Sequence, residues 1–326
     1  MFETVYAKII ATLAAAQHVV IVSHRNPDGD TIGSALALAH YLEQQRVAYT
    51  CYCVDEPAPY FKFLPKADGI GPHPTIWQDQ TVDVVVVVDA GDLTYAGVAD
   101  HVTQLPKPYT LINIDHHVTN PGYGDINLVV SDASSTCEIV YHILDSIRAV
   151  DRSIATCLLA GLITDTGSFS NLATTASAVA VASKLVACGA NLPQISKRTL
   201  QNRPYSTLKL WGRALERLHE DPTTGMIVTM LTLDDIQECK VDDEAMSGIS
   251  NFLNRLEQAA NKAILVLTQS TPGIIKGSLR TTNPLLDVST FAKLYGGGGH
   301  TKAAGFTIQG TLTLTPNGYA ILSPSH

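Results

Sequence analysis

Five consecutive valines, residues 84–88, lie between Asp83 and Asp89. An apolar run of this length, without polar alternation, predicts a strand that is buried on both faces. Such strands are typical of α/β proteins, in which helices cover both sides of a parallel sheet. The run therefore predicts an α/β fold, and it puts the Asp89 carboxylate at the carboxyl end of a strand, where open α/β sheets bind their ligands.

Three further segments carry acidic or imidazole side chains at or just beyond the end of an apolar run. Alone, an Asp-Gly-Asp turn or an Asp at the end of a helix has an ordinary structural explanation. Four such segments in one chain instead favour a shared site. The residues concerned are His24, Asp28 and Asp30 after residues 19–22, Asp115, His116 and His117 at the end of residues 111–115, and Asp165 after residues 158–163.

These donors have the chemistry of a divalent metal site. Carboxylate and imidazole ligands suit Mn²⁺ or Mg²⁺ better than the thiolate-binding metals. Four aspartates and two histidines are too many for one small ion, but they suit two ions about 3.5–4 Å apart that share a carboxylate. Two divalent ions would also balance the four negative charges, and the chemistry expected of such a pair is that of phosphate esters.

The four segments resemble, in order and spacing, the four motifs of the DHH phosphoesterase superfamily, with Asp115-His116-His117 as the naming triplet. The resemblance implies a centre of two Mn²⁺ ions, with Mg²⁺ or Co²⁺ as alternatives, bridged by Asp89. It implies that His117 lies behind the ligands or faces the substrate phosphate. The implied metal ligands are His24, Asp28, Asp30, Asp89, His116 and Asp165.

A second group of candidate residues lies near the C-terminus. Four glycines, residues 296–299, precede His300, and such a run lets backbone N–H groups close on an anion, although it could also serve as a flexible linker. Upstream, Ser278 and Arg280 alternate along a predicted strand and would project from one face. Arginine and histidine make charge-assisted hydrogen bonds to phosphate oxygens.

These elements resemble the Ser-Leu-Arg and Gly-Gly-Gly-His motifs of the DHH-associated C-terminal domain. In the family this domain holds the nucleotide of the substrate against the metal centre. The resemblance implies catalytic roles for His117, Arg280 and His300. The implied substrate-binding residues are Ser278, Arg280, Gly297, Gly298, Gly299 and His300.

Charge and composition narrow the partners. The chain of 326 residues has a formal net charge of −8, yet residues 276–302 contain four basic side chains and one acidic one. Proteins that follow long nucleic acids need a broad basic face, so this local excess favours one or a few phosphates rather than a long duplex. The six cysteines form no CxxC pair, and we find neither an 18-residue apolar span nor a secretory signal. We therefore expect a cytoplasmic protein without a membrane partner.

The pattern of elements predicts two α/β domains that face each other across an active-site cleft. Residues 1–190 would form a larger metal-binding domain with a mainly parallel sheet, residues 191–220 a helical linker, and residues 221–326 a smaller substrate-binding domain. The predicted strands are 18–23, 47–54, 83–89, 109–115, 226–232, 263–269, 274–281 and 304–309, and the predicted helices are 2–16, 31–45, 135–147, 151–163, 174–188, 243–260 and 288–295.

Within the superfamily, the chain resembles the stand-alone NrnA-like enzymes. This implies a metal-dependent phosphoesterase and exoribonuclease that degrades short oligoribonucleotides to mononucleotides and dephosphorylates 3′-phosphoadenosine 5′-phosphate (PAP). It also implies pairing of protomers. The expected reaction is in-line attack on phosphorus by hydroxide, available at neutral pH because metal ions acidify water.

The sequence leaves two alternatives to this function open. Residues 170–172, Ser-Asn-Leu, stand where many relatives carry an Arg-aromatic pair. This departure leaves linear or cyclic dinucleotides, pApA or c-di-AMP, as alternative substrates. The second alternative is a nucleotide-binding module without turnover, which the complete set of ligand positions disfavours.

Overall fold

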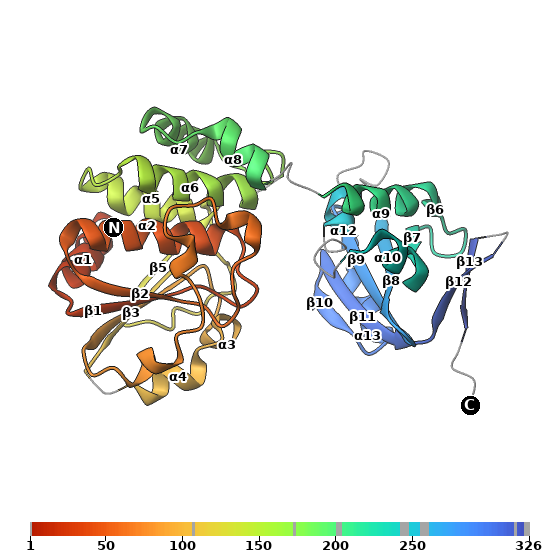
Figure 1. Cartoon of the computed structure of the whole chain (residues 1–326), viewed down its shortest axis with the longest axis horizontal. Coiled ribbons are helices and arrows are strands. Elements are labelled where there is room, and N and C mark those ends of the chain that lie inside the picture. The colour runs from red at the N-terminus through yellow and green to blue at the C-terminus, as the bar shows by residue number, and fades with distance from the viewer. Residues whose placement is uncertain are drawn as a thin grey trace. The chain divides into compact units, whose positions relative to one another are not determined.

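The computed structural model of the chain describes residues 2–105, 108–171, 174–199, 204–241, 248–254, 261–315 and 318–322. These residues form two compact units, Met1–Asn202 and Arg203–His326 (Figure 1). Each unit has its own sheet and its own hydrophobic core. The predicted α/β class is confirmed.

The N-terminal unit contains a five-stranded sheet in the order β2-β1-β3-β4-β5, in which every neighbouring pair is parallel. Four of these strands match predicted ones, whereas the short β5 was not predicted. All five carboxyl ends lie at one edge of the sheet, because the strands run the same way. The strands are β1 His18–Val22, β2 Ala48–Tyr52, β3 Val82–Val88, β4 Thr110–Asp115 and β5 Ile126–Val129.

Helices cover both faces of this sheet (Figure 1). One face carries α1, α2, α5 and α6, with α7 and α8 outside them, and the other carries α3 and α4. Side-chain caps start several of these helices, since Asp28, Ser135 and Asp151 each accept a backbone N–H at the first turn. The helices are α1 Phe2–Ala15, α2 Gly29–Gln45, α3 Leu93–Ala96, α4 Ala99–Gln104, α5 Thr136–Ser146, α6 Arg152–Asp165, α7 Ala176–Ala187 and α8 Leu192–Thr199, with short 3₁₀ turns at Pro59–Phe61, Ala67–Gly69 and Pro74–Gln78.

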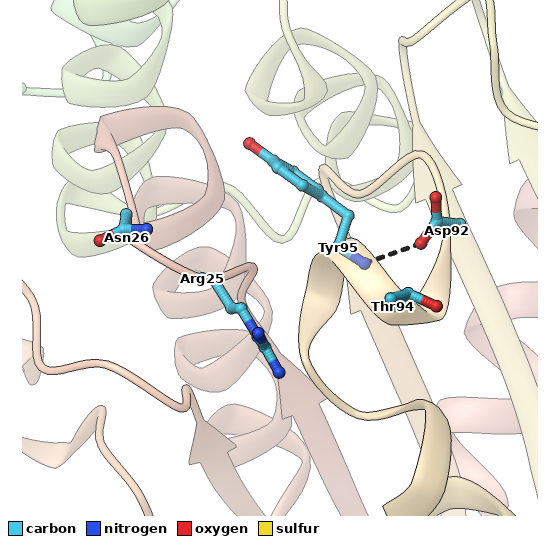
Figure 2. Close-up of a pocket in the computed structure, with 5 residues that line it drawn as sticks. All are labelled: Arg25, Asn26, Asp92, Thr94 and Tyr95. Carbon is cyan, nitrogen blue, oxygen red and sulfur yellow. Dashed lines mark hydrogen bonds between the residues drawn. The ribbon is translucent and has the colours of Figure 1, made fainter. Parts of the chain in front are cut away.

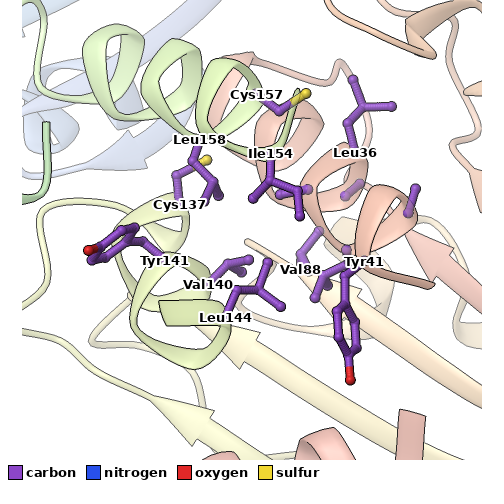
Figure 3. Close-up of a cluster of buried hydrophobic side chains, with 14 of the residues drawn as sticks. Leu36, Tyr41, Val88, Cys137, Val140, Tyr141, Leu144, Ile154, Cys157 and Leu158 are labelled. Carbon is purple, nitrogen blue, oxygen red and sulfur yellow. The ribbon is translucent and has the colours of Figure 1, made fainter. Parts of the chain in front are cut away.

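The valine run forms β3, and it is buried on both faces as predicted. Val84, Val86 and Val88 belong to the core beneath α2, α5 and α6, part of which appears in Figure 3. Val85 and Val87 belong to a separate core on the opposite face. Successive residues of a strand point to opposite faces, so a continuous valine run satisfies both cores at once.

The C-terminal unit contains a six-stranded sheet in the order β10-β11-β9-β8-β7-β6 and a separate β12–β13 hairpin. Only the β7–β8 pair of the larger sheet is parallel. The strands are β6 His219–Glu220, β7 Ile227–Leu231, β8 Ala263–Thr271, β9 Ile274–Thr281, β10 Gly298–His300, β11 Ala303–Gln309, β12 Thr311–Thr315 and β13 Gly318–Leu322, and the helices are α9 Tyr205–Glu216, α10 Leu233–Cys239, α12 Ile249–Leu253 and α13 Val288–Leu294.

The segment predicted as a helical linker, residues 191–220, is divided between the units. Its first helix, α8, packs on α6, and its second helix, α9, packs on α10 and β7. Each helix has an apolar stripe that needs a core, so neither stands alone as a connector. Most of the helix predicted at 243–260 lies outside the described residues, and α12 occupies its described part.

Within the described ranges, no single helix is long and apolar enough to cross a membrane. The pair α7 and α8, bent by 115°, meets the length and composition criteria only when the two are taken together.

Candidate metal centre

The predicted metal ligands of the N-terminal unit come together at the carboxyl edge of its sheet. His24 follows β1, Asp89 follows β3 and His116 follows β4. Asp30 is added from the first turn of α2, and Asp165 is the last residue of α6. Residues from distant parts of the chain thus meet at the edge where parallel α/β sheets place their ligand sites.

Close packing of α2 on α6 joins the two helical contributions. A side chain at Gly33 would meet the carbonyl oxygen of Cys157 at 2.5 Å, and one at Gly161 would meet the carbonyl oxygen of Gly29 at 2.8 Å. Glycine at these positions lets the two helix backbones touch. The contact brings Asp30 close to Asp165.

The ligand atoms fall into two groups, and Asp89 lies between them. His24 Nε2 is 3.5 Å from Asp89 Oδ2 and 3.7 Å from Asp28 Oδ1. His116 Nε2 is 3.5 Å from the other oxygen of Asp89, Oδ1, and 3.9 Å from Asp165 Oδ2. Donor atoms that are each roughly 2.1 Å from a common ion lie about 3–4 Å apart. The spacing therefore suits cations in both groups.

The two groups are His24, Asp28 and Asp89 on one side, and Asp30, His116 and Asp165 on the other; a third possible group, Asp89, His116 and His117, overlaps both. Within each group, one possible ligand atom per residue lies within 4.8 Å of the others. The two oxygens of Asp89 face histidines that belong to different groups, which is the arrangement of a bridging carboxylate.

The backbone of Asp89 has an unusual conformation. Its φ angle is +59°, in the left-handed region that residues other than glycine seldom occupy. Its N–H remains hydrogen-bonded to the carbonyl oxygen of Ile114 at 3.0 Å, so the end of β3 is still joined to β4. Local strain of this kind is concentrated at functional sites.

Hydrogen bonds turn both ligand histidines toward the cluster. His24 Nδ1 is 2.7 Å from the carbonyl oxygen of Arg25, and His116 Nδ1 is 3.4 Å from that of Ala133. A carbonyl oxygen only accepts, so in each ring Nδ1 carries the proton. Nε2 is then the nitrogen that would bind a cation, in place of any proton it carries, with the ring oriented by the Nδ1 contact.

His117 is placed differently from His24 and His116. Its Nδ1 donates to Asp115 Oδ1 at 2.8 Å, and its side chain is 44% exposed. Asp115 also accepts from Asn120 Nδ2 at 2.6 Å, and the same amide donates to the carbonyl oxygen of Ala90 at 3.1 Å. Asn120 therefore connects Ala90, which follows Asp89 at the end of β3, to Asp115, the carboxylate that orients His117. Our sequence analysis did not identify it, because a single asparagine in a loop carries no local signal.

The N-terminus of α5 supports two of the carboxylates. Thr136 N donates to Asp30 Oδ2 at 2.6 Å, and Cys137 N donates to Asp30 Oδ1 at 2.8 Å. Thr136 Oγ1 donates to Asp89 Oδ1 at 3.1 Å. The helix dipole and the first N–H groups of a helix stabilise negative charge. Thr136 and Cys137 are further residues that sequence analysis missed.

Burial and mutual repulsion dominate the electrostatics of the cluster. Burial raises the pKa of Asp89 to about 6, against the opposing effect of His24. Burial and neighbouring carboxylates raise the pKa of Asp30 and of Asp165 to about 7. Although burial alone would lower it, the pKa of His24 rises to about 11 because Asp28 and Asp89 lie beside it. Cations would remove this repulsion, so the donor set fits divalent metal ions.

In the C-terminal unit, strand register brings the predicted substrate-binding residues into two adjacent rows. Arg280 of β9 pairs with Ala303 of β11, which pairs with His300 of β10. In the neighbouring row, Ser278 pairs with Gly305, which pairs with Gly298. Residues directly opposite each other in an antiparallel pair share a face.

Arg280, His300, Ser278 and Gly298 therefore belong to one face of the sheet. Arg280 is partly buried, and this burial lowers the pKa of its guanidinium. It donates from Nη1 to its neighbour's carbonyl oxygen, Leu279 O, at 2.9 Å. His300 on the edge strand is exposed.

The glycine run is a turn followed by an edge strand rather than an open loop. Gly296 has φ +72°, and residues 298–300 form β10. A side chain at Gly297 would meet the carbonyl oxygen of Gly305 at 2.1 Å, and one at Gly299 would meet that of Ala303 at 2.6 Å. Nothing lies within 4 Å of the corresponding position at Gly298. Gly297 and Gly299 thus have packing roles, and Gly298 is open to a ligand.

The class of protein defined by this fold and cluster is an α/β protein with a candidate divalent-metal centre at the carboxyl edge of its parallel sheet. Residues 18–162 match the N-terminal domain of the DHH family, and residues 227–315 match the DHHA1 domain. The chain belongs to the DHH family.

Named relatives agree with this assignment. A bifunctional oligoribonuclease and PAP phosphatase NrnA from Thermus thermophilus is 30% identical over 90% of this chain and 84% of that protein. A protein of the same name from Bacillus subtilis is 24% identical over 92% of both chains. The solved structure of an exopolyphosphatase-related protein from Bacteroides fragilis covers 95% of this chain and 92% of its own, with a TM-score of 0.85 and 24% identity, which establishes the shared fold.

Two relatives with other names bear on the alternatives. A cyclic-di-AMP phosphodiesterase PdeA from Listeria monocytogenes is 25% identical over 90% of this chain, which spans 45% of that protein. A probable manganese-dependent inorganic pyrophosphatase from Streptococcus mutans is 24% identical over 78% of this chain and 87% of that protein.

Proposed function

We propose that the protein is a phosphoesterase dependent on two divalent metal ions, which hydrolyses short oligoribonucleotides to mononucleotides and removes the 3′-phosphate of PAP. The observation that carries the proposal is the position of Asp89, whose two oxygens face His24 and His116 in two separate ligand groups. The relatives named NrnA supply the substrate class.

The proposed ligands of one ion are His24, Asp28 and Asp89, and those of the other are Asp30, Asp89, His116 and Asp165. When bound, the two ions would offset the charge of the phosphate and lower the pKa of an attacking water. Mn²⁺ is the ion we propose, with Mg²⁺ and Co²⁺ as alternatives, because the set combines carboxylates with two imidazoles. The manganese-dependent relative supports that choice.

Residues of this chain would then orient the substrate and handle its protons. Asp115 occupies Nδ1 of His117, so Nε2 is the nitrogen left to contact the scissile phosphate or the leaving oxygen. Arg280 and His300 would bind the phosphate of the nucleotide that is held by the C-terminal unit. The Ser278 hydroxyl and the backbone around Gly297, Gly298 and Gly299 would complete this contact.

The cysteines support a cytoplasmic location as part of the proposal. All six are free thiols, and only Cys188 is exposed. Free, mostly buried cysteines suit a reducing compartment.

The test is an incubation of the purified protein with Mn²⁺ and a ladder of labelled oligoribonucleotides that starts at the dinucleotide, together with PAP, pApA and c-di-AMP. We expect preferential loss of the shortest oligomers and release of phosphate from PAP. Long oligomers cleaved as fast as dimers would contradict the proposal.

Two other outcomes would assign a different function. Cleavage confined to c-di-AMP or pApA would favour second-messenger turnover, the activity named for the Listeria relative. Binding of these nucleotides without cleavage under any divalent metal would favour a binding module.

A further inference from the structure

An open pocket of about 500 Å³ lies beside the metal ligands in the N-terminal unit (Figure 2). Arg25 and Asn26 line it from the segment between β1 and α2. Asp92, Thr94 and Tyr95 line it from the segment after β3. Its volume is within the range of roughly 300–1,000 Å³ that is typical of small-molecule sites.

The pocket and the metal cluster share a wall. The ring centroids of Tyr95 and His24 are 5.0 Å apart, and the rings are inclined by 33°. His24 presents Nε2 to Asp28 and Asp89, so the tyrosine ring lies against the ring of a proposed metal ligand. The pocket is therefore separated from the proposed metal site by the His24 side chain alone.

The hydrophobic core does not account for the position of Tyr95. In the same short helix, Ala96 is buried in the core and Leu93 packs against it. The Tyr95 side chain is outside that core and 49% exposed. Its backbone is nevertheless held in place, because Tyr95 N donates to Asp92 Oδ1 at 2.7 Å and Tyr95 O accepts from Arg25 N at 3.4 Å. The result is an exposed aromatic ring on a fixed backbone.

Two other lining residues, Arg25 and Asn26, offer polar groups to the same pocket. Arg25 and Asn26 are both exposed, and Asn26 has φ +50°. Within the described part of the chain, Arg25 forms no ion pair, and its side chain lies against Gly97, where a Cβ would meet its Nε at 2.7 Å. Asp92, the one carboxylate of the lining, already accepts from Tyr95 N. An aromatic ring and a cation without an ion-pair partner that line the same pocket suit a nucleotide, since bases stack on aromatic rings and phosphates bind arginine.

We propose that this pocket binds the second nucleotide of the substrate, with its base stacked on Tyr95 and the next phosphate along the chain bound by Arg25. The inference rests on the proposed function. PAP consists of one nucleotide and the phosphate that is removed, whereas pApA carries a further nucleoside on that phosphate. The pocket therefore distinguishes an oligonucleotide from PAP.

The test is the ratio of kcat/KM for pApA to kcat/KM for PAP, measured with Mn²⁺ in wild-type protein and in three variants. Tyr95→Ala should lower the ratio about tenfold, the scale of losing one base–aromatic stack. Tyr95→Phe keeps the ring and should keep the wild-type ratio. Tyr205→Ala, which removes a tyrosine that is 81% exposed on the C-terminal unit, is the matched control and should also keep it.

An equal loss on both substrates in Tyr95→Ala would overturn the inference and leave Tyr95 as a support for His24. An unchanged ratio would overturn it as well. If wild-type protein cleaves neither compound, the proposed function fails. Calorimetric binding of pApA and PAP in the presence of Mn²⁺ then tests, independently of cleavage, whether the pocket binds the second nucleotide. Weaker binding of pApA alone in Tyr95→Ala would still support it, and any other binding result would reject it.

Arg25 provides a second readout. The next phosphate is present in a triadenylate but absent from pApA. Arg25→Ala should therefore lower kcat/KM for pApApA relative to pApA, by about the tenfold that is typical of a charge-assisted hydrogen bond. Equal values of this ratio in variant and wild type would remove Arg25 from the proposed site.

Discussion

The two units place their candidate residues by different means. In Met1–Asn202, side chains from four distant segments meet at the ends of buried parallel strands, and carboxylates predominate. In Arg203–His326, the candidate residues lie along neighbouring antiparallel strands, and their rows are set by strand register. The first arrangement creates a buried excess of negative charge, which bound cations would offset. The second creates a partly exposed face suited to an anion. From this difference we infer that the metal chemistry belongs to the first unit and that the second unit binds a phosphate of the substrate, and the following predictions test that division.

The largest expected effect is on turnover, from a change in the N-terminal unit. Asp89→Asn keeps the shape of the side chain but weakens the carboxylate shared by the two ligand groups. We expect kcat on PAP to fall by about 10³-fold, the scale of losing a main electrostatic element of an active site. A steady-state phosphate-release assay measures it.

Asp83→Asn is the matched control for that change. Asp83 stands at the opposite end of the same valine run, where its carboxylate accepts from Gln17 N and His18 N. The same substitution there should leave kcat unchanged. Full turnover by Asp89→Asn with two bound Mn²⁺ would remove the basis of the proposed function.

Metal should stabilise one unit and not the other. The two tryptophans are divided between the units, with Trp77 in the first and Trp211 in the second. In Trp211→Phe protein, Trp77 fluorescence reports the N-terminal unit, and we expect stabilisation by about 2.7 kcal/mol when free Mn²⁺ exceeds its Kd about 100-fold. In Trp77→Phe protein, Trp211 should report no shift between EDTA and Mn²⁺. An equal shift from both reporters would contradict the division.

An acid-sensitive contact is expected in the C-terminal unit. Asp235 is buried, which would raise its pKa, but hydrogen bonds from Arg217, Thr232 and Arg213 outweigh burial and hold the pKa well below its usual range. A depressed folded pKa contributes stability above the unfolded value of about 3.9, and this stability is lost as the pH falls below that value.

Asp235→Asn should therefore destabilise the C-terminal unit by about 2 kcal/mol at pH 7, the scale of hydrogen bonds to a charged group. The difference from the parent protein should shrink as the pH falls below about 4. Urea unfolding followed by Trp211 in Trp77→Phe protein measures it. A difference that is constant with pH would show that the charge of Asp235 is not responsible.

The smallest expected effect concerns substrate binding by the C-terminal unit. Arg280→Ala should raise KM for PAP about tenfold, through loss of a charge-assisted hydrogen bond, without changing the stabilisation by Mn²⁺. Lys276→Ala, on the same face of β9 but outside the two rows, is the control and should change KM little. If Arg280→Ala lowered kcat and left KM unchanged, Arg280 would belong with the chemical step.

Much of this arrangement could be predicted from sequence, because buried parallel strands are continuous apolar runs. The apolar run before Asp89 and the apolar run that ends at Asp115 indicated where the carboxyl edge of the sheet lies. The acidic and imidazole side chains at that edge were then the candidate metal ligands. Ser278 and Arg280 followed from simple alternation along β9.

The supporting residues could not be predicted in this way. Thr136 contacts Asp89 from a helix start that is adjacent to it only in the folded chain. Asn120 follows His117 closely in sequence, but it lies in a loop without any periodic pattern. Tyr95 lies on a four-residue helix that has no periodicity to detect. The division of residues 191–220 between the units depends on which core each amphipathic helix covers, and that is a property of tertiary packing.

In the proposed centre, Asp89 is shared by two metal ions within the N-terminal unit. Anomalous X-ray scattering from crystals of the full chain grown with Mn²⁺ tests it most directly. We expect two peaks per chain, both in contact with Asp89, one also in contact with His24 and the other also in contact with His116. A single peak, or two peaks of which one does not contact Asp89, would contradict it.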